Sequence, residues 1–246
     1  MMKAGLVPVA VLTLFFSPLP ASAQQDHEDS ILYGKALDNT LAVYHNLEKD
    51  QSRLYNGKQY TGYPFNFVEG SPYLDSLFFR DGSVIYDDIT YPGIPLLFDD
   101  LSQKLITKDL DFDLELVSER IAAFTIASHH FIRFVADSLN RGPLKTGFYE
   151  VLYPGPTTVL KKLYKNILED PTITEGILRT IQETTDYFIR TVCGYHKVNS
   201  KRELLDVLDD HKKEIQRVIR KSKFKYRKHK DEILLQVAAE YDQLKK

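Results

Sequence analysis

The sequence predicts an α+β protein in which an N-terminal helix leads into an antiparallel β meander or open barrel, followed by C-terminal amphipathic helices. Two observations support this fold class. Between residues 54 and 192, short apolar runs are separated by turn-forming residues, a pattern typical of antiparallel strands. Before residue 50 and after residue 200, apolar residues instead recur every three or four positions, which indicates helices with one apolar face.

Residues 1–23 have the features of a secretory signal peptide. Lys3 supplies a positive charge, residues 6–16 are mainly apolar, and Ala21-Ser22-Ala23 is a small-residue cleavage site. The apolar stretch is short for a segment that spans a bilayer. We therefore expect an exported protein, periplasmic or associated with the outer membrane, whose mature chain has no transmembrane segment.

The mature chain should begin with a helix between Ser30 and Asp50. Its apolar residues are spaced by four, four and three positions from Tyr33 to Tyr44, and Ser30 can cap the first turn. The pattern then changes to strands. Asn56-Gly57 lies between aromatic residues and predicts a type I′ hairpin turn, because both residue types tolerate a positive φ.

Two pairs of aspartates mark predicted turns. Asp87-Asp88 follows a strand at residues 83–86, and Asp99-Asp100 follows a buried strand at residues 94–98. Aspartate suits turns because its carboxylate accepts hydrogen bonds from nearby backbone amides. Pro92-Gly93 predicts a break between the return from the first turn and the second strand.

Seven later apolar runs predict further strands of the same sheet, whereas residues 165–186 are compatible with a strand, a loop or a short helix. The predicted strands lie at residues 104–107, 114–117, 122–126, 130–134, 148–153, 159–164 and 187–192.

From Ser200 onward the helical period returns. Ser200 and Glu203 have the spacing of a capping box, in which each side chain accepts a hydrogen bond from a backbone amide of the other. Three amphipathic helices follow. We therefore divide the chain into a signal peptide (residues 1–23), a helix plus antiparallel β domain (residues 24–199) and a helical region packed on it (residues 200–246).

Charge is distributed unevenly along the chain. Between His211 and Lys230 there are ten Lys or Arg residues and one acidic residue, a formal charge of +9. Removal of Lys3 with the signal peptide leaves 31 basic and 34 acidic residues, so the rest of the mature chain carries −12. A basic segment of this kind predicts an anionic partner.

The leading functional hypothesis is a non-catalytic periplasmic or envelope module that binds through this basic region. The partner would be an envelope protein or an anionic surface component. An exported protein meets little nucleic acid, so we expect no nucleic-acid partner, and the sequence leaves the oligomeric state open. The predicted partner-binding residues are Arg220, Lys221, Lys223, Lys225, Arg227 and Lys228.

No familiar catalytic signature is present. The sequence has no Walker loop, no G-x-G-x-x-G, no G-x-S-x-G, no H-E-x-x-H and no C-x-x-C pair. Adjacent histidines on a strand point to opposite faces, so His129 and His130 are not expected to bind one metal. Cys193 is the only cysteine, and its apolar neighbours predict a buried structural thiol. We assign no catalytic residue, metal or cofactor.

Two alternatives remain open at this level. The aromatic residues, 15 Tyr and 14 Phe, suggest a carrier with a small-ligand cavity inside the β domain. The other alternative is an envelope hydrolase of unrecognised type that uses His129 or His130 with an aspartate. An enzyme is thus less favoured than a binding module but is not excluded.

Three motifs resemble an uncharacterised family of exported Bacteroidota proteins. They are L-Y-N-G-x-x-Y at residues 54–60, G-S-V-x-Y-D-x-x-x-Y-x-x-x-P-L-L at residues 82–97 and I-R-K-x-K-x-K-x-R-K at residues 219–228. The resemblance extends from about residue 50 to the C-terminus. It implies export and a shared architecture, and it implies no activity and no catalytic residue. Asp88 departs from the family pattern, in which Gly is expected in the turn.

Overall fold

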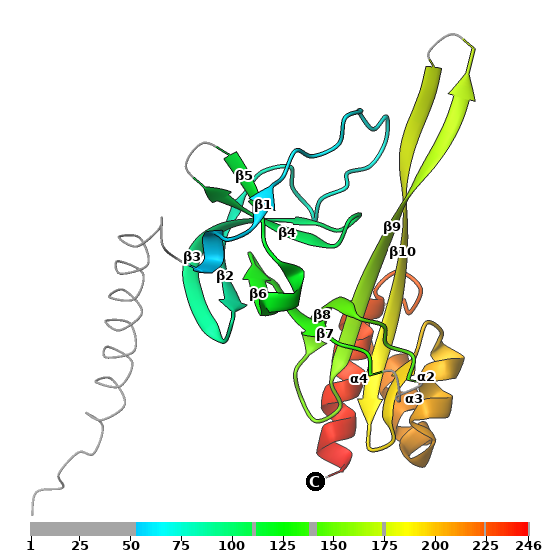
Figure 1. Ribbon diagram of the computed structural model, residues 1–246. Coiled ribbons are helices and arrows are strands. Elements are labelled where there is room, and N and C mark those ends of the chain that lie inside the picture. Colours follow the sequence, from blue (N-terminus) through cyan, green and yellow to red (C-terminus); the bar gives the residue numbers. More distant parts are fainter. Residues whose placement is uncertain (1–52, 110–111, 138–141, 174–175, 224, 246) are drawn as a thin grey trace, which may run out of the picture. The chain divides into compact units, whose positions relative to one another are not determined.

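The computed structural model describes residues 53–245, except residues 110–111, 138–141, 174–175 and 224 (Figure 1). The predicted signal peptide at residues 1–23 and the predicted helix at residues 30–50 lie outside the described residues. Their assignment therefore remains a prediction.

The described residues form an 11-stranded open sheet in which all neighbouring strands are antiparallel. The fold is thus mostly β, with helices mainly near the C-terminus, in agreement with the predicted α+β class. The strands are β1 (Lys58–Gln59), β2 (Arg80–Tyr86), β3 (Ile89–Asp99), β4 (Lys104–Asp109), β5 (Phe112–Glu115), β6 (Ile121–Ile126), β7 (His129–Phe134), β8 (Gly147–Tyr153), β9 (Val159–Thr172), β10 (Gly176–Thr191) and β11 (Gly194–Lys197).

Most of the sheet consists of two meanders, β2 to β5 and β6 to β11, and β1 is added beside β5; the strand order is β1-β5-β4-β3-β2-β6-β7-β8-β9-β10-β11. Within each meander, strands that are consecutive in sequence are neighbours, as short antiparallel connections require. β2 joins the two meanders because it pairs with β3 along one edge and with β6 along the other. Val84 of β2 thus lies opposite both Tyr91 and Phe124.

The two aspartate pairs form turns, as predicted. Asp87 and Asp88 have φ angles of 50° and 62°, the left-handed pair of a type I′ turn, and they connect β2 to β3. Asp99 ends β3, and its Oδ1 atom accepts a hydrogen bond from the backbone N–H of Ser102 (3.0 Å). The aspartate at position 88 is therefore compatible with the turn geometry, although the resemblance suggested a glycine there.

Two local predictions in this part of the chain were wrong. Pro92-Gly93 does not interrupt a strand, because β3 continues through it. The register between β2 and β3 shifts here, and Gly93 has a φ of 65°, which are the features of a β-bulge. Asn56-Gly57 does not form a hairpin turn either. It follows the 3₁₀ turn η2 (Arg53–Tyr55) and leads into β1, which pairs with the distant strand β5.

Residues 165–186, which the sequence left ambiguous, mostly belong to one long hairpin of β9 and β10 (Figure 1). The two strands remain in register from Val159 opposite Ile189 to Thr172 opposite Gly176. β8 accompanies β9 only as far as Lys161. Beyond that point, one edge of β9 has no strand partner among the described residues.

The segment between β1 and β2 crosses this hairpin. The backbone N–H of Val68 donates to the carbonyl of Arg179 (2.8 Å), and that of Ile181 donates to the carbonyl of Glu69 (2.9 Å). Further along the segment, Tyr73 pairs with Asp99 at the end of β3. This crossing segment therefore links the long hairpin to the first meander.

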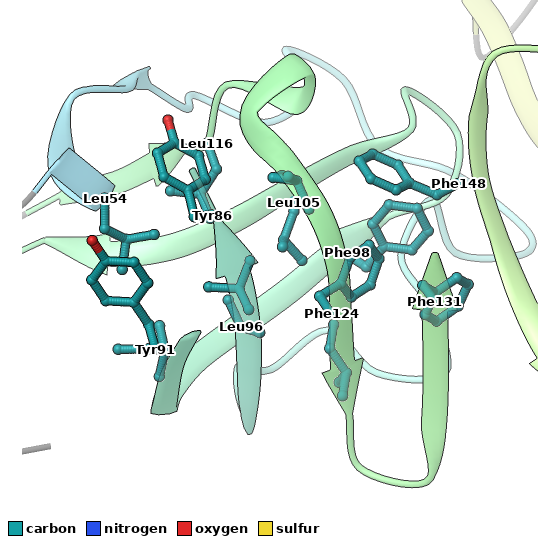
Figure 2. Packing of buried hydrophobic residues seen from close by; sticks show 14 of the residues in the cluster. Leu54, Tyr86, Tyr91, Leu96, Phe98, Leu105, Leu116, Phe124, Phe131 and Phe148 are labelled. Atoms are coloured by element: carbon teal, nitrogen blue, oxygen red, sulfur yellow. The ribbon is translucent and has the colours of Figure 1, made fainter. Parts of the chain in front are cut away.

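Aromatic side chains fill the core of the first meander and the strands next to it. The ring of Phe98 lies 5.0 Å from that of Phe124, 5.2 Å from that of Phe131 and 5.8 Å from that of Phe148, measured between centroids. Figure 2 shows these four rings packed together. The hollow that borders three of them measures about 70 Å³, well below the several hundred cubic ångströms typical of a small-molecule site.

Three helices follow the sheet, α2 (Lys201–Val207), α3 (Lys212–Lys221) and α4 (Lys230–Leu244), with the 3₁₀ turn η4 (Asp209–His211) between α2 and α3; another 3₁₀ turn, η3 (Ser118–Arg120), lies between β5 and β6. The predicted capping box at Ser200 and Glu203 is present. The apolar faces of the helices pack in one cluster with Val159 of β9 and Ile189 of β10. None of the helices in the described ranges is long and apolar enough to cross a membrane.

Candidate functional site

The six predicted partner-binding residues are all exposed. Arg220 and Lys221 end α3, and the other four lie in the segment between α3 and α4. Lys and Arg side chains in folded proteins are often paired with carboxylates, which reduces their attraction for a partner. Here, none of the six forms an ion pair with another described residue. Their charges are therefore available to a partner.

The structure does not gather these six residues around one site. Lys221 and Lys223 line a groove of about 760 Å³ between α3 and α4, which we call the α3–α4 groove. Arg227 and Lys228 line a different hollow of about 480 Å³, beside β9 and β10. The two hollows share no lining residue, and Arg220 and Lys225 line neither. The basic segment at residues 220–228 is thus divided between two surfaces.

The α3–α4 groove has a mixed lining. Its apolar residues are Val218, Leu235 and Ala239, and Leu235 is 44% exposed. Its charged and polar residues are Glu214, Arg217, Lys221, Ser222, Lys223, Gln236, Glu240 and Gln243. The lining therefore combines apolar area with charges, a hydroxyl group and amide groups.

The second hollow contains contacts that hold α4 against the sheet. Asp231 of α4 forms an ion pair with Lys161 of β9 (2.7 Å) and accepts a hydrogen bond from the hydroxyl of Tyr187 (2.5 Å). Lys161 also pairs with Glu150 of β8 (3.3 Å). Because these groups satisfy one another, we interpret this hollow primarily as a structural junction.

The adjacent histidines point to opposite faces of the sheet, as predicted, and do not converge. Nδ1 of His129 lies 2.5 Å from Glu150 and Nε2 lies 2.8 Å from Asp75, whereas Nδ1 of His130 lies 3.1 Å from the hydroxyl of Thr125. The hydrogen bond to Glu150 raises the pKa of His129 above its usual range. Both ring nitrogens of His129 thus contact carboxylates, one of which is an aspartate, whereas His130 has no carboxylate partner among the described residues.

Asp99 is fully buried and acts as a structural acceptor. It receives hydrogen bonds from the hydroxyl groups of Tyr60 (2.8 Å), Tyr63 (2.8 Å) and Ser102 (2.6 Å). Two of these donors belong to the crossing segment, so Asp99 fixes that segment to the end of β3. Similarly, Asp87 of the other aspartate pair forms an ion pair with Arg120. Neither carboxylate is placed for acid–base chemistry.

Asp100 has a different environment. It is only 3% exposed, and its Oδ2 atom has no hydrogen-bond partner among the described residues. Burial raises the pKa of Asp100 to about 7. It borders a cavity of about 480 Å³, which we call the Asp100 cavity, and also the small hollow beside the aromatic core. The sequence suggested only a turn at this position.

Two buried lysines of β9 lie near Asp100 and were not anticipated from the sequence. Nζ of Lys162 donates to Oε1 of Gln103 (2.9 Å) and to the carbonyl of Phe148 (3.1 Å), and burial lowers the pKa of Lys162 to about 8. Nζ of Lys165 lies 4.0 Å from Oδ2 of Asp100. The only sequence signal was the occurrence of lysines within and directly after an otherwise apolar strand pattern from residue 159 to residue 164.

The prediction for Cys193 was wrong. Its thiol is exposed in the turn between β10 and β11, and its backbone N–H donates to the hydroxyl of Thr191 (3.2 Å). The apolar neighbour Val192, which suggested burial, is fully exposed as well. Within the described ranges, no group of His, Cys, Asp and Glu side chains is arranged to hold a metal ion.

In comparisons with protein-family models, curated proteins and solved structures, nothing matches this chain.

Proposed function

We propose that this protein is a non-catalytic envelope module whose α3–α4 groove binds an acidic segment of another envelope protein. Export and the relationship to exported Bacteroidota proteins are parts of the same proposal. The observation that carries it is the exposure of Lys221 and Lys223, without ion pairs to described residues, beside a groove of about 760 Å³ whose lining also includes apolar residues. Charge would attract the partner and apolar contact would retain it.

The lining favours a protein segment over a lipid surface. A surface that binds anionic headgroups is expected to be uniformly basic, since every acidic residue on it opposes binding. The groove includes Glu214 and Glu240, which would repel headgroups but can pair with a basic residue of a peptide. Gln236 and Gln243 add amide groups that can bond to a peptide backbone.

The test compares two double charge reversals in the intact chain. Lys221→Glu/Lys223→Glu changes the groove, and Lys201→Glu/Lys213→Glu changes net charge equally at exposed sites that line neither hollow and are not among the six predicted partner-binding residues. Each protein is used to capture partners from the detergent-solubilised envelopes of its own organism, and affinity is then measured with the purified partner at low and high salt.

We expect the groove variant to lose at least tenfold in affinity and the control variant to bind nearly as the wild type does. High salt should weaken wild-type binding because it screens exposed charges. If both variants lost the same affinity, the effect would be explained by net charge alone, and the proposal that the groove is the binding site would be contradicted. If vesicles with anionic lipids bind the wild type but not the groove variant, and no protein does, the partner is a membrane surface and the proposal is wrong.

A further inference from the structure

The second hollow is lined by polar and charged side chains. They belong to Lys161, Thr185, Tyr187, Arg227, Lys228, Lys230, Asp231 and Glu232. Its volume of about 480 Å³ lies within the range of small-molecule sites. None of these described lining residues is aliphatic, so the lining favours a charged ligand over an apolar one. The hollow shares no lining residue with the α3–α4 groove, and a ligand here would be separate from the proposed partner of that groove.

One wall of the hollow is occupied by the contacts that hold α4 against the sheet. Both carboxylate oxygens of Asp231 are engaged, because Oδ2 pairs with Lys161 (2.7 Å) and Oδ1 accepts from the hydroxyl of Tyr187 (2.5 Å). Lys161 also pairs with Glu150 (3.3 Å), which does not line the hollow. A ligand must therefore be recognised by the other residues of the lining.

The other wall carries three basic residues without a carboxylate partner. Arg227 and Lys228 are exposed, and Lys230 is half-buried. None of the three forms an ion pair with another residue in the described ranges. Glu232 is the acidic residue on this wall, and it lies 3.4 Å from Nδ1 of His229. Over the whole lining, four basic and two acidic residues leave a formal charge of +2.

The local backbone brings these cations together. Arg227 and Lys228 lie just before α4, and Lys230 is the first residue of this helix. The chain turns at this point, because the backbone N–H of Lys228 donates to the carbonyl of Lys225 (2.9 Å). Nζ of Lys230 lies 5.5 Å from the centroid of the Tyr187 ring. The three basic side chains therefore border one hollow beside β10 instead of pointing in unrelated directions.

We propose that the second hollow binds the phosphate group of a phosphomonoester. Such a group carries a charge of about −1.5 to −2 near neutral pH, which matches the +2 of the lining, whereas a carboxylate supplies a single negative charge. The guanidinium group of Arg227 can donate to two phosphate oxygens at once, and the ammonium groups of Lys228 and Lys230 supply further donors. The hydroxyl group of Thr185 on β10 is an additional donor at the same hollow.

A phosphomonoester can come from a soluble phosphorylated compound or from a lipid headgroup, so the test uses both forms. The soluble probes are glucose 6-phosphate, glucuronate and glucose, titrated calorimetrically into the intact chain in phosphate-free buffer of low ionic strength. The membrane probes are vesicles of phosphatidylcholine that contain phosphatidic acid, or phosphatidylglycerol at the same surface charge, and binding is measured by cosedimentation. Phosphatidic acid has a phosphomonoester headgroup, and phosphatidylglycerol has a phosphodiester.

Three variants accompany the wild type. Arg227→Gln/Lys228→Gln removes two of the three unpaired cations of the hollow. Arg220→Gln/Lys225→Gln is the matched control, because it removes the same residue types at exposed sites of the same segment that line neither hollow. Arg227→Lys keeps the charge but removes the bidentate donor geometry. All of these positions are exposed, so the variants should fold as the wild type does.

We expect glucose 6-phosphate, or vesicles with phosphatidic acid, to bind about tenfold or more tightly than the other probes of the same form. Arg227→Gln/Lys228→Gln should weaken this binding about tenfold or more, Arg227→Lys should weaken it less, and the control variant should leave it nearly unchanged. Binding of glucose 6-phosphate would identify a soluble ligand, and binding of the phosphatidic acid vesicles alone a lipid headgroup; both results support the proposal.

Three results would overturn it: no binding of either phosphomonoester at millimolar concentration, no preference for the phosphomonoester within either set of probes, or equal losses in the hollow variant and the control variant, which would reduce the effect to net charge. The groove variant Lys221→Glu/Lys223→Glu should bind the phosphomonoester nearly as the wild type does, and Arg227→Gln/Lys228→Gln should still capture the partner of the groove. Failure of this inference and failure of the proposed function are therefore distinguishable.

Discussion

The ammonium group of Lys165 lies 4.0 Å from the Oδ2 atom of Asp100 but directs its protons to three other oxygen atoms. The Oδ2 atom therefore experiences the low polarity of the interior without a hydrogen bond from any described residue. Its raised pKa is a consequence of this arrangement.

Asp100 should make the stability of the protein depend on pH. Its pKa rises from 3.8 to about 7 on folding, so between these values the folded state binds more protons than the unfolded state. The contribution of Asp100 to stability should consequently be highest below about pH 4, fall as the pH rises to 7, and not fall further above that. Relative to Asp100→Asn, the wild type should lose on the order of 4 kcal/mol across this window.

Urea denaturation of the wild type and Asp100→Asn from pH 4 to pH 8 measures this difference. Other carboxylates titrate in both proteins, so their contributions cancel in the comparison. A constant difference between the two proteins would show that Asp100 ionises normally in the folded state.

His129 should make the stability of the protein depend on pH in a higher pH range than Asp100 does. The hydrogen bond to Glu150 raises its pKa above 6.5, so its stabilising effect is complete below pH 6.5 and is lost as the pH rises through the folded-state pKa. His129→Gln should therefore cost more stability at pH 5.5 than at pH 9, as measured by chemical denaturation. His130→Gln, on the opposite face and bonded to Thr125, controls for loss of an imidazole. An equal cost of His129→Gln at both pH values would contradict the prediction.

Phe98 should be among the most sensitive core positions. Its ring is 1% exposed and contacts three other phenylalanine rings, so truncation leaves a large void. We expect Phe98→Ala to destabilise the protein by about 3–5 kcal/mol in thermal or urea denaturation. Phe78, which is 76% exposed, provides the matched control, and Phe78→Ala should change stability by less than about 0.5 kcal/mol. Comparable losses in both variants would mean that the rings of this core do not pack as described.

The capping box at the start of α2 should make a measurable contribution to the free energy of unfolding. The Ser200 hydroxyl accepts from the backbone N–H of Glu203 (3.2 Å), and the Glu203 carboxylate accepts from the backbone N–H of Ser200 (3.1 Å). Ser200→Ala should cost about 1 kcal/mol, because it leaves a helical N–H without its acceptor. Lys201→Ala, at the neighbouring exposed site, should be nearly neutral. If both substitutions had the same effect, the cap would have no energetic role.

The turns and helix starts could be predicted because they depend on residues close together in the chain. Asp87-Asp88 forms its turn through its own backbone preferences, and Ser200 caps a helix through a residue three positions away. The prediction for Pro92-Gly93 was wrong because a neighbouring strand accommodates the pair as a bulge. Similarly, Val192 and Cys193 form a short apolar run that is nonetheless exposed in the turn between β10 and β11.

The mostly antiparallel sheet, the helical C-terminal region and the strongly basic segment could be predicted from the amino-acid order, because period, turn chemistry and charge are properties of neighbouring residues. That Lys221 and Arg227 line different hollows, and that Asp100 lies beside Lys165, became known from the folded chain. Folding brings together residues 65 positions apart, and burial then raises the pKa of a carboxyl group that the local sequence assigns only to a turn.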